Sequence, residues 1–246
     1  MALGLHNNTT TSVQTSFCPS ELSPEIWLHL HNANQLTVNE DNSISEWKNN
    51  GSAEDYTQIS AARKPTAINN SLESALYQRA VSFDGCDYLQ SVTETRIGAN
   101  GYVAIVHMCD DWGAGNQAFL GDVDSNNSFI RTSNDTTFYF KAYDGSGYSQ
   151  KGLGINSPAA LVDATFYAFI FNYNSVGNID CYINGVLQTS SPTHGADFYW
   201  AIQEIGAKNG VTQTLTGDIK SVVAGNIYLD SDQVVKLNNY LQRYIG

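Results

Sequence analysis

Hydrophobic and polar residues alternate along much of the chain, which is the pattern of β-strands with one buried face. The clearest case begins at Ile179. Ile179, Cys181 and Ile183 fall on one face of an extended chain, and Asp180 and Tyr182 fall on the other. The alternation therefore predicts a half-buried strand over 179–183.

A turn signal follows this strand directly. Asn184-Gly185 supplies the two positive-φ residues that a type I′ hairpin turn requires. Val186-Leu187 then begins the returning strand. The stretch 179–187 is therefore predicted to be a β-hairpin.

Further short strands are predicted where apolar runs end in turn residues. They cover 26–30, 45–48, 80–85, 102–108, 137–143, 165–171 and 215–223. The run 102–108 is apolar almost throughout, as expected of a central strand in a sandwich. The residues expected in the core are Val81, Phe83, Ile105, Phe169, Ile183 and Ile219. Frequent strands without long helical repeats predict an all-β sandwich of two antiparallel sheets.

One helix is predicted at the end of the chain, from about Asp230 to Tyr244. Asp230 can cap it, and Gln233 stands at the reciprocal position of a capping box. Apolar residues then recur on one face, at Val234, Leu237, Leu241 and Tyr244. We expect this stripe to pack against the sandwich. A short helix is also predicted over 71–78.

Residues 1–20 are predicted to form an extended arm, and residues 21–246 one jelly-roll domain. The sizeable apolar side chains of the arm are Leu3, Leu5, Val13 and Phe17. Burying four such side chains contributes about 6–10 kcal/mol at best, whereas ordering twenty residues costs about 20 kcal/mol or more. We therefore expect the arm to lie along a neighbouring subunit, anchored by Leu3, Leu5 and Phe17.

Charge and cysteine content narrow the classes of partner. The formal net charge is −12, which argues against nucleic acid and anionic membranes as partners. The first residues lack the pattern of a secretory signal, and no apolar run approaches 18 residues. We expect synthesis in a cytoplasm and four free thiols, at Cys18, Cys86, Cys109 and Cys181.

Several motifs, taken in order, resemble those of one family. They are Ile26-Trp27-Leu28, Trp47-Lys48-Asn49-Asn50-Gly51, Val81-Ser82-Phe83-Asp84-Gly85 with Tyr88-Leu89, the hairpin 179–185, Glu204-Ile205-Gly206, Leu215-Thr216-Gly217-Asp218-Ile219, and the closing helix. Together they resemble the laminin-G-like branch of the concanavalin A-like lectin/glucanase superfamily, over residues 24–246. His29 and Asn49 depart from acids usual in the family. The resemblance implies a two-sheet jelly roll and leaves function open, because the superfamily includes lectins, hydrolases, adhesion modules and virion proteins.

Catalytic and metal-binding patterns are weak. Hydrolases of this superfamily commonly carry an E-x-D-x-E array on one strand, and the sequence has none. The stretch from Asp122 resembles a calcium loop but has Asn127 and Ser133 where Gly and Glu belong. His29 and His31 are more typical of an edge strand than of a zinc site. We expect no metal, no cofactor and no enzymatic activity.

Carbohydrate binding usually requires exposed aromatic rings flanked by polar side chains. Trp112 lies in an Asp- and Gly-rich loop that follows a predicted strand. Tyr143 and Tyr148 flank a second loop of this kind, 144–147. Trp112, Tyr143 and Tyr148 are therefore the candidate carbohydrate-binding residues, with coverage of the sandwich edges as the alternative role.

The sequence supports three functions. The leading interpretation is a non-enzymatic virion structural protein, a bacteriophage capsid decoration or another surface-exposed head or tail component. This interpretation rests on the predicted arm, on the low proportion of charged residues and on the lack of a catalytic array in the sequence. Its partners would be capsid or tail subunits and copies of itself, on the virion surface after synthesis in the host cytoplasm. The alternative is a lectin-like module that recognises a host glycan, and the third is a hydrolase.

Overall fold

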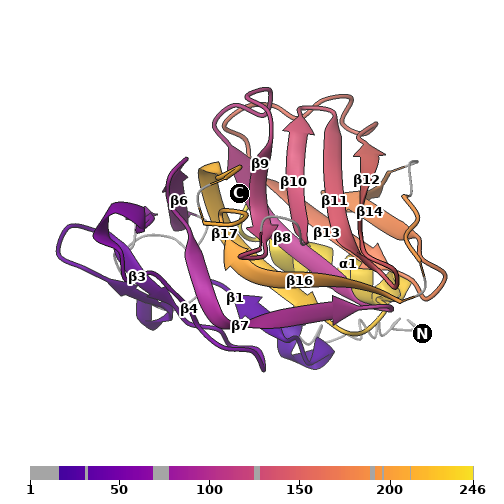
Figure 1. The fold of residues 1–246 in the computed structure, drawn as a ribbon, viewed down its shortest axis with the longest axis horizontal. Coiled ribbons are helices and arrows are strands. Elements are labelled where there is room, and N and C mark those ends of the chain that lie inside the picture. Colours follow the sequence, from indigo (N-terminus) through magenta and orange to yellow (C-terminus); the bar gives the residue numbers. More distant parts are fainter. Residues whose placement is uncertain are drawn as a thin grey trace, which may run out of the picture.

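The computed structural model describes residues 17–30, 33–68, 78–124, 128–188, 192–195, 197–210 and 212–245. Leu3, Leu5 and His31 lie outside these residues, as does most of the short helix predicted over 71–78. The described residues form two antiparallel sheets, one long helix and short 3₁₀ segments (Figure 1). The 3₁₀ segments are Pro19–Leu22, Ala33–Gln35 and Ala61–Arg63.

The first sheet has eight described strands, in the order β15-β14-β13-β8-β17-β6-β5, with β1 pairing β17. They are β1 (Ile26–Leu28), β5 (Thr66–Ile68), β6 (Ala80–Asp84), β8 (Tyr102–Cys109), β13 (Tyr167–Tyr173), β14 (Ile179–Ile183), β15 (Val186–Leu187) and β17 (Thr216–Gly225).

The second sheet has nine described strands, in the order β12-β11-β10-β9-β16-β7-β4-β3-β2. They are β2 (Leu36–Val38), β3 (Ile44–Trp47), β4 (Tyr56–Thr57), β7 (Leu89–Gly98), β9 (Gln117–Gly121), β10 (Phe129–Asn134), β11 (Thr137–Asp144), β12 (Tyr148–Gly154) and β16 (Phe198–Ile205).

The main core lies between the inner faces of the two sheets. All six residues predicted to be buried are at most 1% exposed: Val81, Phe83, Ile105, Phe169, Ile183 and Ile219. The predicted hairpin is also confirmed. Asn184 and Gly185 have φ values of 50° and 83°, and β14 pairs β15 antiparallel. The two-sheet sandwich predicted from the alternation is therefore the observed fold.

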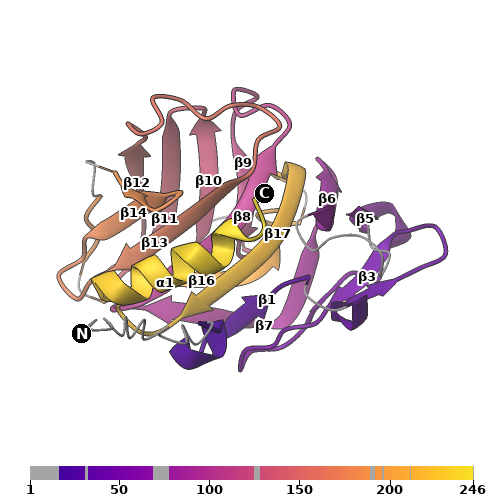
Figure 2. The ribbon, with the colours of Figure 1, turned by 180° about the vertical axis from the view of Figure 1, so that it is seen from behind.

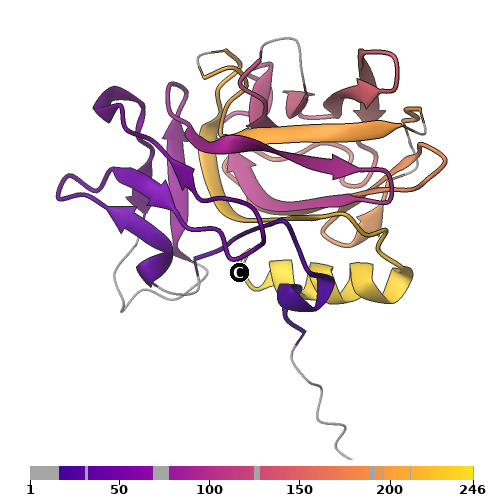
Figure 3. The same cartoon turned by 60° about the horizontal axis from the view of Figure 1, so that its bottom comes forward.

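A third layer is the helix α1 (Ser231–Gln242), which lies against the outer face of the eight-stranded sheet (Figures 2 and 3). Asp230 accepts a hydrogen bond from the Gln233 backbone, and the Gln233 side chain accepts one from the Asp230 backbone. The predicted stripe of Val234, Leu237, Leu241 and Tyr244 is buried. It packs on side chains of β8, β13 and β17, so the predicted helix is confirmed.

The N-terminal end of the described chain packs against the same helix. The ring of Phe17 lies 6.5 Å from that of Tyr240, edge to face, and Leu22 is buried in the same cluster. Phe17 thus contacts α1 of its own chain, and its role as an anchor on a neighbouring subunit stays a prediction.

The outer face of the nine-stranded sheet carries no helix within the described residues. Along β11, Phe138, Phe140 and Ala142 are buried, while the residues between them remain partly exposed. Strands β7 and β16 run across the ends of β9 to β12 (Figure 1). Strand β16 pairs β9 near its C-terminal end and β11 near its N-terminal end. This outer face is therefore where side chains from several strands can meet a ligand.

All four cysteine thiols are free, with Cys109 and Cys181 buried. Burial raises the pKa of the Cys181 thiol well above its ordinary value, which keeps it protonated and unreactive. Within the described residues, no helix is both long and apolar enough to cross a membrane.

Candidate functional site

Three tyrosines cluster on the uncovered face of the nine-stranded sheet. Tyr143 and Tyr148 are cross-strand partners on β11 and β12, with ring centroids 5.6 Å apart, edge to face. Tyr199 of β16 stacks on Tyr143 at 4.9 Å with an interplanar angle of 24°. The two tyrosines predicted from the sequence are thus brought together, and a third joins them.

Hydrogen bonds fix the rings of this tyrosine cluster (Tyr143, Tyr148 and Tyr199). The Tyr143 hydroxyl donates to the carbonyl of Gly145 at 3.0 Å, and the hydroxyls of Tyr148 and Tyr199 are 3.2 Å apart. Burial, followed by the hydrogen bond with Tyr199, raises the pKa of Tyr148, so its phenol stays neutral. Three oriented phenols form a preorganised surface, which lowers the entropic cost of binding.

The turn beside the cluster is held by Asp144. Its carboxylate accepts hydrogen bonds from the hydroxyl and amide of Ser146 at 2.9 and 3.2 Å. Gly147 also donates an amide hydrogen to Asp144 at 3.2 Å. These donors, Ser146 first, lower the pKa of Asp144 to about 2, so the carboxylate is ionised at neutral pH. The loop predicted over 144–147 is confirmed as a tight turn, with Gly145 at a φ of 90°.

A cation completes the cluster. The guanidinium carbon of Arg96, on β7, lies 4.6 Å above the ring centroid of Tyr199. Glu94, two residues earlier, pairs with the Arg96 Nε and orients the group. The surface therefore combines half-exposed aromatic rings, phenolic hydroxyls and a fixed guanidinium. Rings for apolar contact and polar groups for orientation are what a small-ligand or sugar site needs.

Trp112, the third sequence candidate, lies elsewhere. It is fully buried between the sheets, where its ring packs against His107, Tyr167 and Phe169. Its indole N–H donates to the carbonyl of Val162 at 3.0 Å. With no ring face exposed, Trp112 cannot serve as a stacking platform. The loop folds inward because both its apolar ring and its polar N–H find partners there.

One carboxylate on β16 has an unusual environment. Glu204 is 1% exposed and accepts a hydrogen bond from the Gly210 amide at 2.9 Å. Burial raises the pKa of Glu204 to about 7. The group lies beneath the segment 206–210 and holds it to the sheet. Its burial indicates a structural role for this acid.

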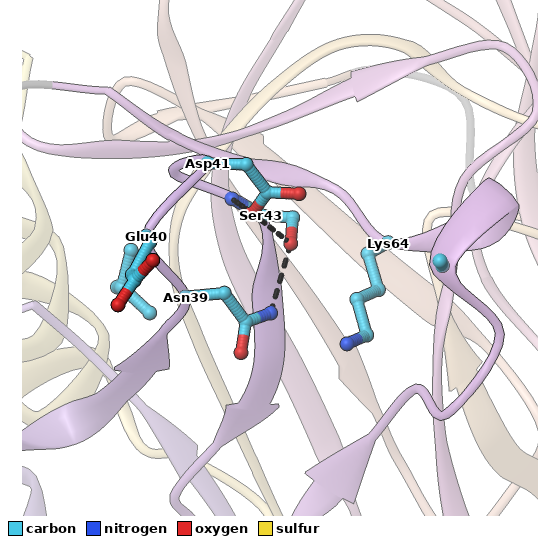
Figure 4. A pocket seen from close by; sticks show the side chains of 7 residues that line it. Asn39, Glu40, Asp41, Ser43 and Lys64 are labelled. Atoms are coloured by element: carbon cyan, nitrogen blue, oxygen red, sulfur yellow. Dashed lines mark hydrogen bonds between the residues drawn. The ribbon is translucent and has the colours of Figure 1, made fainter.

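A depression at the other end of the nine-stranded sheet is lined by residues of the β2–β3 turn and by Lys64 (Figure 4). Asp41 accepts the Ser43 hydroxyl at 2.6 Å, and the Asn39 amide donates to the same hydroxyl at 2.8 Å. These polar groups serve the turn itself. Among the described residues, no three His, Cys, Asp or Glu side chains gather as metal ligands.

More than half of the chain matches a known protein family. Residues 103–235 match the family model described as the concanavalin A-like lectin/glucanases superfamily, Laminin_G_3. The chain belongs to this superfamily. This matches the resemblance drawn from the motifs and agrees with the two-sheet fold. No curated protein matches the chain by sequence.

Solved structures resemble this concanavalin A-like chain in fold. The binding domain of Paraclostridial Mosquitocidal Protein 1 has a TM-score of 0.56 and 10% identity, and the match covers 89% of this chain and 52% of that one. The binding domain of botulinum neurotoxin DC, in complex with SialylT, has a TM-score of 0.52 and 14% identity, with 89% and 52% covered. Trypanosoma rangeli sialidase, in complex with the inhibitor DANA, has a TM-score of 0.53 and 12% identity, with 87% and 32% covered.

These similarities establish the fold alone, since the identities are low. The chain also spans about half the length of the toxin binding domains and about a third of the sialidase. What those proteins bind is therefore not transferred by the match.

Tyr199 and Arg96 are the parts of the cluster that the sequence analysis missed. Tyr199 is the outward residue between two buried neighbours, Phe198 and Trp200, so alternation alone could have placed it on the exposed face. Its stacking on Tyr143 depends on the pairing of β11 with β16. Such pairing between distant segments is not encoded in any local pattern.

Proposed function

We propose that this chain is a carbohydrate-binding module of lectin type, which binds glycans on the uncovered face of its nine-stranded sheet. The observation that carries the proposal is the cluster of Tyr143, Tyr148 and Tyr199 beneath Arg96. Its rings supply apolar contact and its hydroxyls and guanidinium supply oriented polar contact. The membership of a lectin/glucanase superfamily supports the same class of function.

The module would bind without hydrolysing its ligand. The acid on this face with a raised pKa, Glu204, is buried and engaged with backbone amides. The turn acid, Asp144, is engaged with Ser146 and Gly147. Neither the fold nor these similarities test the expectation that the chain is a virion component, and it stays a prediction.

A glycan array followed by titration calorimetry tests the proposal. We expect Tyr199→Ala to weaken binding of the best oligosaccharide about tenfold, because losing an anchoring aromatic costs about 1–2 kcal/mol. Tyr228→Ala is the matched control. Tyr228 is an exposed tyrosine that contacts Asp180 of β14, in the other sheet. Equal affinities for wild type and Tyr199→Ala, or binding to no glycan, would refute the proposed site.

A further inference from the structure

Three cations gather on the same uncovered face, next to the tyrosine cluster. Arg131 of β10 lies with its guanidinium carbon 4.9 Å from the ring centroid of Phe129 and 5.3 Å from that of Tyr139. The Lys208 ammonium lies 4.6 Å from the Phe129 ring. Lys141 of β11 is the cross-strand partner of Phe129. These residues form a cation cluster (Arg131, Lys141 and Lys208) around one aromatic ring.

The cluster is unusual in this chain. The whole sequence has 12 Lys and Arg against 24 Asp and Glu, so three cations at one place run against its acidic charge. Among the described residues, no carboxylate forms an ion pair with any of the three. Besides burial, it is Lys141 and Arg131 that lower the pKa of Lys208. The positive charges therefore repel one another without local compensation.

Arg131 is the cation of the three whose burial most needs a hydrogen-bond partner. It is only 8% exposed, and its Nε and Nη1 have no hydrogen-bond partner among the described residues. Burying the N–H donors of a charged group without hydrogen-bond partners is unfavourable. Such a group in a native fold calls for an explanation, and a role in binding an anion is one that fits. Two aromatic rings already hold the guanidinium in place.

The cation cluster is continuous with the tyrosine cluster. Tyr139, Lys141 and Tyr143 alternate on the outward side of β11. Residues two apart on a strand are separated by about 6.6–6.8 Å, so one oligosaccharide could span both groups. The fold also fixes Lys208. A Cβ at Gly121 would lie 2.5 Å from the Ala207 carbonyl oxygen and 2.9 Å from the Lys208 Cα, so glycine lets this segment lie close on β9.

We propose that Arg131, Lys141 and Lys208 bind a singly charged oxyanion, a carboxylate or a sulfate group carried on an acidic glycan. This inference rests on the proposed function and names the ligand class of the same surface. The guanidinium suits such groups because its planar N–H donors match two oxygens at once. The lysines add charge from either side of Phe129, and the tyrosine cluster would hold the adjoining sugar.

The test separates the anion from the sugar. We would titrate the protein with sodium sulfate and with sodium acetate at constant ionic strength, following amide chemical shifts by NMR. We expect saturable shifts on β10, on β11 and near Lys208. Arg131→Gln and, as a second variant, Lys208→Gln should each weaken anion binding at least tenfold. Arg243→Gln and Lys236→Gln, which remove exposed cations of the helix layer, are the matched controls and should bind as wild type.

Oligosaccharides form the second arm: one uronate-containing, one sulfated and one neutral, of equal length. We expect wild type to prefer an acidic one, and the two acidic ligands to show whether the group is a carboxylate or a sulfate. Arg131→Gln should lose that preference and keep its affinity for the neutral ligand. Non-saturable anion shifts, or equal anion binding by Arg131→Gln and Lys208→Gln, would overturn the inference even if neutral glycans bind. Saturable anion binding without any glycan binding would keep the anion site and refute the lectin function.

Discussion

The imidazole of His107 lies 4.3 Å, centroid to centroid, from the ring of Phe119, deep between the two sheets. The rings of Phe169 and Trp112 lie 4.8 and 5.1 Å away. Neither imidazole nitrogen has a hydrogen-bond partner within the described part of the chain. Burial lowers the pKa of His107 to about 3, so this residue behaves as a neutral member of an aromatic core.

The pH dependence of stability should report this histidine. Its pKa rises to about 6.5 on unfolding. Between pH 6.5 and 3 the unfolded chain therefore binds a proton that the native chain does not. As the pH is lowered through this range, the free energy of unfolding falls by up to about 1.4 kcal/mol per pH unit. We expect His107→Phe to lose less stability than wild type between pH 7 and pH 4, measured by urea unfolding. His107→Gln, which cannot titrate but keeps a polar group in the core, should flatten the pH dependence while remaining less stable at pH 7. Parallel wild-type and His107→Phe profiles would contradict this.

Glu204 should have the opposite effect. Its pKa is about 7 in the fold and about 4.3 in an unfolded chain. Between these values the native state binds the extra proton, so stability falls as pH rises. Glu204→Gln should therefore gain stability relative to wild type as pH is raised from 4.5 to 7. The difference between the two unfolding free energies at each pH is the measurement, and a difference that does not change with pH would show that Glu204 does not titrate there.

The capping box of α1 gives a stability prediction. Asp230→Ala removes the side chain that accepts the Gln233 amide at 2.8 Å, and loss of such a cap costs about 0.5–2 kcal/mol. We expect a loss of about 1 kcal/mol in the free energy of unfolding. Asp232→Ala is the matched control, because it removes an acid from the same turn and leaves the cap intact. Equal free energies of unfolding for Asp230→Ala and Asp232→Ala would show that the cap contributes less than we expect.

Gly121 links the fold to the cation cluster. Gly121→Ala should push the backbone at Ala207 and Lys208 outward, since the new methyl carbon would meet both. Strain of this kind typically costs about 1–3 kcal/mol. Calorimetry should show weaker sulfate binding together with reduced stability. Gly154→Ala is the control, because a Cβ there meets open space, and sulfate affinity that is the same in both variants would separate Lys208 from the site.

Local patterns in the sequence were enough for much of the fold. The Asn184-Gly185 turn, the Asp230 cap and the strand alternation each depend on neighbouring residues. Trp112 was misplaced because its burial depends on partners some fifty positions away, the Val162 carbonyl and the Asp163 carboxylate. The Asp and Gly residues around Trp112 predict an exposed loop, and nothing nearby in the sequence indicates that this loop turns inward.

The candidate site was predicted only in part, for a related reason. Tyr143 and Tyr148 belong to one hairpin, so their proximity follows from a short turn. Tyr199 meets them because β16 pairs with β11, and Arg131 meets the ring of Tyr139 because β10 pairs with β11. Alignment between strands is set by the packing of the whole core rather than by any one segment. A surface assembled from five strands (β7, β10, β11, β12 and β16) is therefore visible only once the fold is known.

The alternation of β11 has one further consequence. Its inward residues fill the core, and its outward residues supply Lys141 to the cation cluster, Tyr143 to the tyrosine cluster and the ring of Tyr139 beside Arg131. Sliding this strand by a single residue would exchange the two sets, burying a lysine and exposing phenylalanines. Ligand binding by this protein would thus report that β11 has folded in its native register.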